Sequence, residues 1–251
     1  MGVIFLTLSM SLCEISMADS VKFSLGSYYF EGRFSREDRS NFLILPYTMK
    51  LARKQHYWLI SGSRIKLHGS SEIFNDNPEG RDRLTESGTG DVIFKTGHNY
   101  PLRGLIRELS LEAGVKIPVA DKDKKLGSGR ADEELSVKIL LAKPWLLAIN
   151  RTGYKVRGDT KELVYKDTWS NQLTLITPLP YKLSLGLGAF IQSPTTRESV
   201  MRKELSLILS YPLTQAQSLM LYTMNGYTRS SADRGIGFQW SWEWKTPPRG
   251  Q

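Results

Sequence analysis

Five charged residues at regular spacing are the clearest candidates for chemistry in this sequence. Glu108, Glu112 and Lys116 follow one another at intervals of four residues, and Glu134 and Lys138 repeat that interval further along the chain. Residues at even spacing share one face of a β-strand, and opposite charges on adjacent strands can form ion pairs. The pattern predicts either a network that stiffens a sheet or the lining of a small pore with mixed or weakly anionic selectivity.

Alternating strands must position these charges, and the last strand is the most regular of them. Residues 235–244 carry Ile236, Phe238, Trp240, Trp242 and Trp244 on one face and Gly235, Gly237, Gln239, Ser241 and Glu243 on the other. In an outer-membrane barrel the apolar face would meet lipid and the polar face would line the lumen, and tryptophan concentrates at the membrane–water interface. We therefore predict that Phe238, Trp240, Trp242 and Trp244 face lipid.

Twelve segments have the period-two pattern or the β-rich composition of strands. They cover residues 21–30, 41–51, 56–68, 90–97, 105–117, 133–142, 145–157, 162–177, 181–192, 201–211, 217–228 and 234–244. Lengths near ten residues suit tilted strands that cross a bilayer. No segment of helical length has a sustained 3.6-residue period.

The connections between these strands alternate in length. Short ones cover residues 53–55, 99–104, 143–144, 178–180 and 212–216, and those between them are longer in all but one case. An even number of strands with short turns at one end and long loops at the other is the pattern of an outer-membrane barrel. The fold class predicted is all-β, a transmembrane antiparallel up-and-down barrel of about 12 strands, closed by pairing of the last strand with the first.

Residues 1–18 are predicted to be a secretory signal peptide. An apolar core begins at Val3, and Ser16-Met17-Ala18 forms a small-x-small cleavage site. A buried N-terminal strand or helix is the alternative. The chain then divides into a signal peptide, 1–18, and a barrel, 19–251. Cys13 is the only cysteine and would leave with the signal, so the mature chain could form no disulfide.

The positions opposite the apolar faces are the candidate lumen lining. They carry seven basic and five acidic residues: Lys50, Arg64, Lys66, Asp91, Lys95, Glu108, Glu112, Lys116, Glu134, Lys138, Lys182 and Glu204. Trp58 and Tyr154 are assigned to the same surface, where they would contact a hydrophobic solute or serve packing.

Catalysis and metal binding have few candidate residues. Of the histidines at 56, 68 and 98, only His68 falls at a strand end where an outer-membrane lipid hydrolase would carry its base. That enzyme needs a serine nucleophile. Ser63, Ser70 and Ser71 are near His68 in sequence, but no lipase-type motif is present. Three scattered histidines match no zinc spacing, so we expect no catalytic residue, metal or cofactor, and a lipid hydrolase or lipid A-modifying enzyme is the enzymatic alternative.

Several short motifs between residues 40 and 160 resemble one family of outer-membrane proteins. They are Leu45-Pro46-Tyr47, Gly88-Thr89-Gly90-Asp91-Val92, Lys116-Ile117-Pro118, Gly127-Ser128-Gly129, and Trp145 with Asn150 and Gly153-Tyr154. The family is that of the "meta-pathway of phenol degradation" transporters. The resemblance implies a barrel and an outer-membrane address, and phenol is not carried over as a ligand.

The residues of these motifs also have structural explanations. Gly88 and Gly90 would allow positive φ where a long loop enters a strand. Asp91 would accept hydrogen bonds from loop amides, and Pro118 would end a strand because proline cannot donate to the ladder. Where the family tends to have Thr-Gly-Asp, this chain has Val119-Ala120-Asp121.

Together these patterns predict a monomeric protein of the outer membrane of a Gram-negative bacterium, with both termini in the periplasm. Its predicted role is passive passage of small solutes, hydrophobic or aromatic if the resemblance extends to substrate, and a purely structural or binding barrel is the non-enzymatic alternative. Expected partners are outer-membrane lipids and lipopolysaccharide, the barrel-assembly machinery and small solutes. The formal net charge is +9, but the basic residues are scattered along strands, so no nucleic-acid partner is expected.

Overall fold

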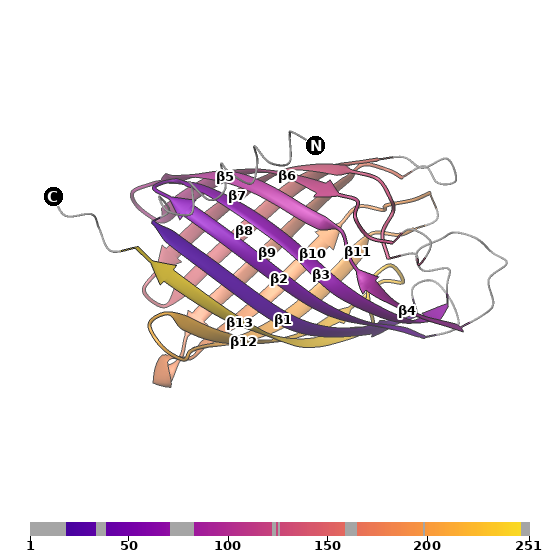
Figure 1. The fold of residues 1–251 in the computed structure, drawn as a ribbon. Coiled ribbons are helices and arrows are strands. Elements are labelled where there is room, and N and C mark those ends of the chain that lie inside the picture. Colours follow the sequence, from indigo (N-terminus) through magenta and orange to yellow (C-terminus); the bar gives the residue numbers. More distant parts are fainter. Residues whose placement is uncertain are drawn as a thin grey trace.

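The computed structural model describes residues 19–33, 39–70, 83–121, 124, 126–158, 165–197 and 199–246, and the predicted signal peptide lies outside them. Antiparallel strands form one sheet that curves into a barrel (Figure 1). The strands are β1 Ser20–Gly32, β2 Ser40–Arg53, β3 His56–Ser70, β4 Arg83–Thr89, β5 Val92–Pro101, β6 Ile106–Ile117, β7 Asp132–Lys143, β8 Leu146–Arg157, β9 Thr168–Pro178, β10 Ser184–Gln192, β11 Arg202–Pro212, β12 Gln217–Gly226 and β13 Arg234–Lys245.

The sheet closes because β1 has a partner on each side. It pairs with β2, and it pairs with β13 in a register that runs from Ser20 opposite Lys245 to Glu31 opposite Arg234. The predicted closure of the last strand on the first is confirmed. Closure satisfies the backbone hydrogen bonds of both strands and leaves no sheet edge at this seam.

One position in the barrel wall is shared by two segments. β3 pairs with β5 over residues 56–61 and with β4 over residues 64–70, and the interruption falls at Gly90 and Asp91. Thirteen segments therefore make a barrel of twelve strands, as predicted. The expected range of 90–97 was too short, because residues 83–89 also pair with β3.

The two ends of the barrel differ. Residues 54–55, 102–105, 144–145, 179–183 and 213–216 connect strands at one end, the turn end, on the left of Figure 1. The longer connections lie at the other end, the loop end. The first and last described residues of the barrel meet at the turn end, where the backbone N–H of Thr246 donates to the backbone carbonyl oxygen of Asp19 at 3.0 Å.

A short 3₁₀-helix, η2 (Pro180–Lys182), changes one predicted boundary. Tyr181 and Lys182 have φ values of 61° and 63°, which excludes them from a strand, so β10 begins at Ser184 and not at 181. The predicted strand over 162–177 begins, in the part that the structure describes, at Thr168. Among the described residues no helix is long and apolar enough to cross a membrane.

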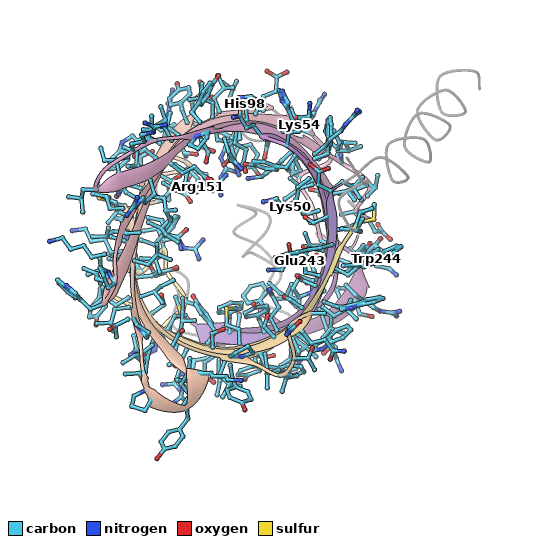
Figure 2. All side chains as sticks on the ribbon, turned by 90° about the vertical axis from the view of Figure 1, so that its left-hand side faces the viewer. Lys50, Lys54, His98, Arg151, Glu243 and Trp244 are labelled. Carbon is cyan, nitrogen blue, oxygen red and sulfur yellow. The ribbon has the colours of Figure 1, made fainter. Side chains whose placement is uncertain are left out.

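Alternation along each strand divides the side chains between the lumen and the outer surface. Figure 2 shows Glu243 of β13 pointing into the barrel and Trp244 pointing away from it. Four of the five outward residues of β13 are exposed although apolar, with Ile236 at 64% and Trp244 at 60%, and Trp240 is half-buried. An apolar belt on the outside of a closed antiparallel barrel is the arrangement of a transmembrane β-barrel.

Aromatic rings pack over glycines on the lumen wall. The Tyr28 ring covers Gly237, where a Cβ atom would overlap the ring and lie 2.7 Å from the backbone oxygen of Ser27. The Tyr57 ring covers Gly97 in the same way. Glycine at these positions lets a bulky ring fit against the wall.

Candidate functional site in the barrel lumen

Charged and small residues alternate across four neighbouring strands on the lumen face. Lys95 of β5 pairs with Gly114 of β6, which pairs with Glu134 of β7. Glu112 of β6 is two residues nearer the turn end than Gly114, and it lies opposite Gly97 of β5. The glycines leave room for the long charged side chains of the adjacent strands, so charges from β5 to β8 can converge.

Arg151 of β8 joins two glutamates at the centre of this wall. Its Nη2 donates to Oε1 of Glu134 at 2.8 Å and forms a closer contact with Oε1 of Glu112. Lys95 Nζ lies 3.2 Å from the same Glu112 oxygen and 3.3 Å from the same Glu134 oxygen. Lys155 Nζ lies 3.6 Å from Glu134 Oε2. Three cations thus share two carboxylates.

The Tyr57 hydroxyl completes this group by donating to Glu112 Oε2 at 2.7 Å. We call the group the central cluster; it consists of Tyr57, Lys95, Glu112, Glu134, Arg151 and Lys155. A cavity of about 180 Å³ adjoins it and is lined by Lys95, Glu134, Arg151, Gly153, Lys155, Thr168, Ser170, Gln172, Phe190 and Gln192. All the residues of the lining but Gly153 and Phe190 present polar groups suited to ions, water or a small polar solute.

A second group ties a long loop to the barrel at the loop end. Lys116 Nζ lies 3.0 Å from Asp132 Oδ2 and 3.4 Å from Asp91 Oδ2. It also donates to Ser128 Oγ at 2.8 Å, and the Ala120 backbone N–H donates to Asp91 Oδ1 at 3.1 Å. The predicted role of Asp91 as an acceptor for loop amides is confirmed.

The prediction of positive φ at Gly88 and Gly90 is wrong, because neither residue has a positive φ. In the same motif region Gly129 has a φ of 66°. Gly88 and Gly90 serve close packing instead. A Cβ atom at Gly88 would lie 2.7 Å from Leu126, and one at Gly90 would lie 2.5 Å from Ser63 Oγ. Three of the family-like motifs, at residues 88–92, 116–118 and 127–129, thus meet where the 118–131 loop packs on the strand break.

Two lysines lie on the lumen face nearer the turn end. Lys138 Nζ lies 3.0 Å from Glu108 Oε1. Lys50 forms no ion pair in the described part of the chain, and its Nζ lies 4.2 Å from the centroid of the Tyr57 ring. Figure 2 shows Lys50 and Arg151 on the inside of the ring of strands.

The opposite lumen wall is aromatic and apolar. Tyr28 and Tyr222 meet edge to face with ring centroids 5.7 Å apart, and Tyr28 stacks on Phe30 at 6.3 Å. Met224 is buried beside them on β12, opposite Gly235 in the register. Glu204, also on this side, is buried and paired with Arg202. The lumen therefore has one charged wall and one aromatic wall.

The strand registers place most of the predicted lining on the lumen face. Those residues are Lys50, Lys95, Glu108, Glu112, Lys116, Glu134, Lys138 and Glu204, with Asp91 at the strand break beside Lys116.

Four predicted positions face outward and are corrected here. Trp58, Arg64 and Lys66 alternate with Tyr57, whose hydroxyl reaches Glu112 in the lumen, so they lie on the other face of β3. Tyr154 lies between Leu135 and Trp169 on the outer surface. Lys182 is in the exposed η2 turn and lines no part of the strand wall.

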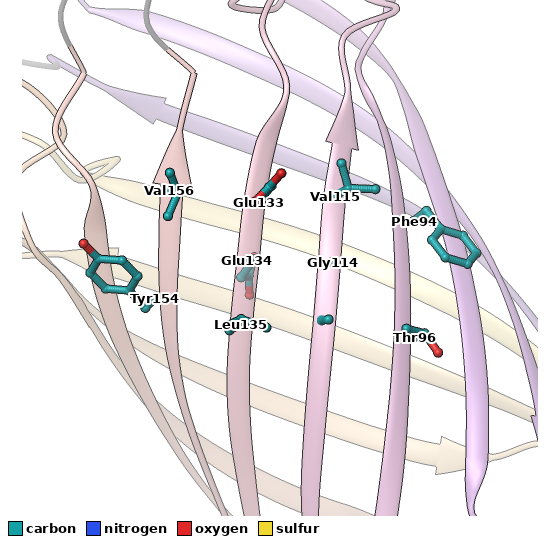
Figure 3. Close-up of a pocket in the computed structure, with 10 residues that line it drawn as sticks. Phe94, Thr96, Gly114, Val115, Glu133, Glu134, Leu135, Tyr154 and Val156 are labelled. Carbon is teal, nitrogen blue, oxygen red and sulfur yellow. The ribbon is translucent and has the colours of Figure 1, made fainter.

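Figure 3 shows where Tyr154 lies instead. It borders an outer-surface groove of about 400 Å³ with Phe94, Val115, Leu135 and Val156. The floor of the groove is formed by small residues of β5 and β6, namely Thr96, Ala113 and Gly114. The groove is therefore part of the apolar outer belt and not of the lumen.

Sequence reasoning missed two cations of the central cluster, Arg151 and Lys155. The signal was present, because Arg151, Lys155 and Arg157 share one face of β8 at even spacing. Tyr154, on the opposite face, was assigned to the lumen in their place. The contribution of Tyr57 was also missed, since a hydroxyl has no pattern until its partner is known.

The structure offers no support for the hydrolase arrangement. His68 Nδ1 lies 2.7 Å from Thr85 Oγ1 on the outward face, whereas Ser63 alternates to the lumen face. The side chains of Ser70 and Ser71 lie outside the described residues. His56 and His98 pair on the outside at the turn end, with Nδ1 atoms 3.1 Å apart. No group of three or more potential metal ligands occurs among the residues that the structure describes.

Comparison with known proteins shows likeness in fold and none in sequence. No protein-family model matches this chain, and no curated protein does. The COG4313 outer membrane channel from Pseudomonas putida F1 has a TM-score of 0.69 at 11% identity, covering 90% of this chain and 96% of that one. The NanC porin has a TM-score of 0.55 at 10% identity, with coverages of 90% and 100%. The KdgM porin has a TM-score of 0.51 at 5% identity, covering 91% of this chain and 99% of that one.

These neighbours are named as an outer membrane channel and two porins, and this chain has a similar fold. At such low identities the likeness concerns the fold alone. The family named from the sequence motifs stays a prediction.

Proposed function

We propose that this protein is a monomeric outer-membrane channel through which small solutes pass by diffusion. The observation that carries the proposal is the lumen wall, where charged side chains of four strands converge beside a polar cavity of about 180 Å³. The proposal is supported by the likeness in fold to barrels named as channels and porins.

The turn end is proposed to face the periplasm. Both ends of the described barrel lie there, as expected for a chain that enters the membrane from the periplasmic side, and bacterial barrels have their short turns on that side. Trp242 and Trp244 then lie near the periplasmic interface, where tryptophan is enriched.

The two unlike walls suggest the class of solute. Tyr28, Phe30 and Tyr222 offer ring surface on one side, and Lys95 and Arg151 offer cationic groups on the other. A small solute with an aromatic or apolar part and a polar or anionic part would contact both walls. We infer that solutes of this kind pass in preference to sugars of equal mass.

Single-channel recording in a planar bilayer tests the channel, and swelling of loaded liposomes tests the solute class. The folded protein is expected to give discrete conductance steps, and benzoate-sized aromatic anions are expected to enter faster than a neutral sugar. Heat-unfolded protein is the control. A folded barrel that neither conducts ions nor admits either solute would exclude the channel, and faster entry of the sugar would exclude the solute class alone.

A further inference from the structure

The corrected positions on β3 form a basic stripe on the outer surface at the loop end. Arg64, Lys66 and His68 occupy successive outward positions, and all three are exposed. Toward the turn end, the outward positions of the same strand are Gly62, Ile60 and Trp58. The outer face of β3 thus changes from apolar to basic between residues 60 and 64.

A column of hydroxyl groups from β4 flanks the stripe. The register places Thr89 beside Arg64, Ser87 beside Lys66 and Thr85 beside His68. The His68 ring is held against this column by the 2.7 Å contact between its Nδ1 and Thr85 Oγ1. Guanidinium, ammonium and hydroxyl groups side by side are the donors that bind phosphate oxygens.

These cations are free of carboxylate partners in the described part of the chain. Arg64 and Lys66 form no ion pair there, and the nearest acidic residue on β4, Glu86, pairs with Leu67 and so lies on the lumen face. An exposed cation without an internal partner is available for an anion from outside the protein.

An apolar groove begins directly below the stripe on the outer wall. It has a volume of about 590 Å³ and lies over β1, β2, β3, β5 and β13. Its lining includes Leu25, Tyr47, Met49, Ile60, Val92 and Trp240. Between groove and stripe lies Gly62, which is covered by the Tyr47 ring. Apolar and basic surfaces are therefore continuous and are arranged along the barrel axis.

We propose that this surface binds a phosphorylated lipid of the outer leaflet. The phosphate lies on Arg64 and Lys66, with His68 and the β4 hydroxyls beside it, and an acyl chain lies in the groove between Tyr47 and Ile60. The order of the two surfaces matches an amphiphile whose headgroup lies at the loop end. Lipid A phosphates of lipopolysaccharide have this chemistry and this location, whereas a free anion would not need the groove.

Binding of lipid A to the folded full-length chain tests the proposal. Native mass spectrometry from detergent micelles would measure the apparent Kd for bis-phosphorylated lipid A and for the same lipid with its phosphates removed. Each cation near an anionic lipid surface contributes about fivefold in affinity. The double variant Arg64→Gln, Lys66→Gln is therefore expected to bind the phosphorylated lipid about 25-fold more weakly, and the dephosphorylated lipid unchanged.

A charge-matched control separates a site from bulk charge. Arg103→Gln with Lys143→Gln also removes one arginine and one lysine, but at the turn end. Heat-modifiable gel migration establishes that each variant folds. The proposal is overturned if both double variants lose affinity equally, if the Arg64 and Lys66 variant binds as tightly as the parent, or if removing the phosphates changes nothing. Equal displacement by equimolar inorganic phosphate would also overturn it, since the groove would then play no part. None of these readouts depends on conductance.

Discussion

The hydroxyl oxygens of Ser24 and Ser241 lie 2.9 Å apart, although 217 residues separate them in the chain. Ser24 is on the first strand and Ser241 on the last, and they are direct partners in the register of β1 with β13. The contact lies on the lumen side of the seam that closes the barrel. It therefore exists only if the two ends of the chain pair in this register.

Cysteines at these two positions are expected to form a disulfide. Directly opposed residues on antiparallel strands have Cα atoms within the range that a disulfide spans. Ser24→Cys with Ser241→Cys, made in a Cys13→Ser background so that no native cysteine competes, should cross-link nearly completely under mild oxidation. Non-reducing gel electrophoresis after boiling would show a species that migrates faster than the reduced chain.

Pairing Ser24→Cys with Ser206→Cys provides the control, because Ser206 faces the lumen from β11, which is three strands away from β1 around the barrel. It should give no intramolecular cross-link. If it oxidised as readily as the pair at the seam, the closure in this register would be disproved.

Replacing Gly237 by alanine is expected to destabilise the barrel by about 1–3 kcal/mol, the usual cost of overpacking. The added Cβ would overlap the Tyr28 ring and lie 2.7 Å from the Ser27 oxygen, which is backbone and cannot turn away. Urea unfolding in lipid vesicles, followed by tryptophan fluorescence, measures the change.

Gly153→Ala is the matched control on the same lumen face. Its Cβ would meet Ser170 Oγ at 3.4 Å and Ser136 Cβ at 3.5 Å, which are ordinary contacts. The expected change is within about 0.5 kcal/mol. Equal effects of the two alanines would show that the ring over Gly237 is not closely packed.

Arg151→Gln is expected to shift ion selectivity toward cations. It leaves Glu112 and Glu134 with Lys95 and Lys155, so the central cluster changes from a net charge of +1 to neutral. Unit charges 4 Å apart interact by about 1 kcal/mol in water, so the permeability ratio should change by at most about fivefold. Reversal potentials under a potassium chloride gradient measure it.

The outward-facing Lys143 serves as the control for that measurement. Lys143→Gln removes the same charge at the turn end, outside the lumen, and should leave the reversal potential unchanged. An Arg151 variant with the parent's selectivity would mean that ions do not pass beside the central cluster.

The sequence was sufficient to predict the twelve strands and the closure, because a period of two and alternating loop lengths are local features. It was misleading for β3, where the rule that apolar residues face outward fails at the loop end. There Leu67 and Phe42 are buried as partners on the lumen side, and Arg64 and Lys66 take the outer positions. The rule holds only within the apolar belt. The residue at which a strand leaves the belt depends on the tilt of the whole barrel.

The contacts of the central cluster could not be read from the sequence either. Lys95, Glu112 and Glu134 were assigned to the lumen from the alternation, but Arg151 reaches Glu112 across β7, a distance of 39 residues in the chain. Which cation meets which carboxylate depends on strand register and on the glycines between them. Neither is encoded in a pattern of a few residues.

The six tryptophans give a test of which surface meets the membrane. Trp58, Trp169, Trp240, Trp242 and Trp244 all occupy outward positions, and Trp145 is exposed in a short turn. Because none lies in the lumen, lipids brominated on their acyl chains should quench most of the fluorescence of the reconstituted protein, whereas aqueous iodide should quench little. Trp240 is four residues from Trp244 on the same outward face, so bromine near the chain end should quench it more strongly. Consequently Trp240→Phe should reduce the quenching by deep bromines, and Trp244→Phe the quenching by shallow ones. Strong quenching by iodide with none by brominated lipid would reverse the assignment of the two faces, and with it the placement of the central cluster in a water-filled lumen.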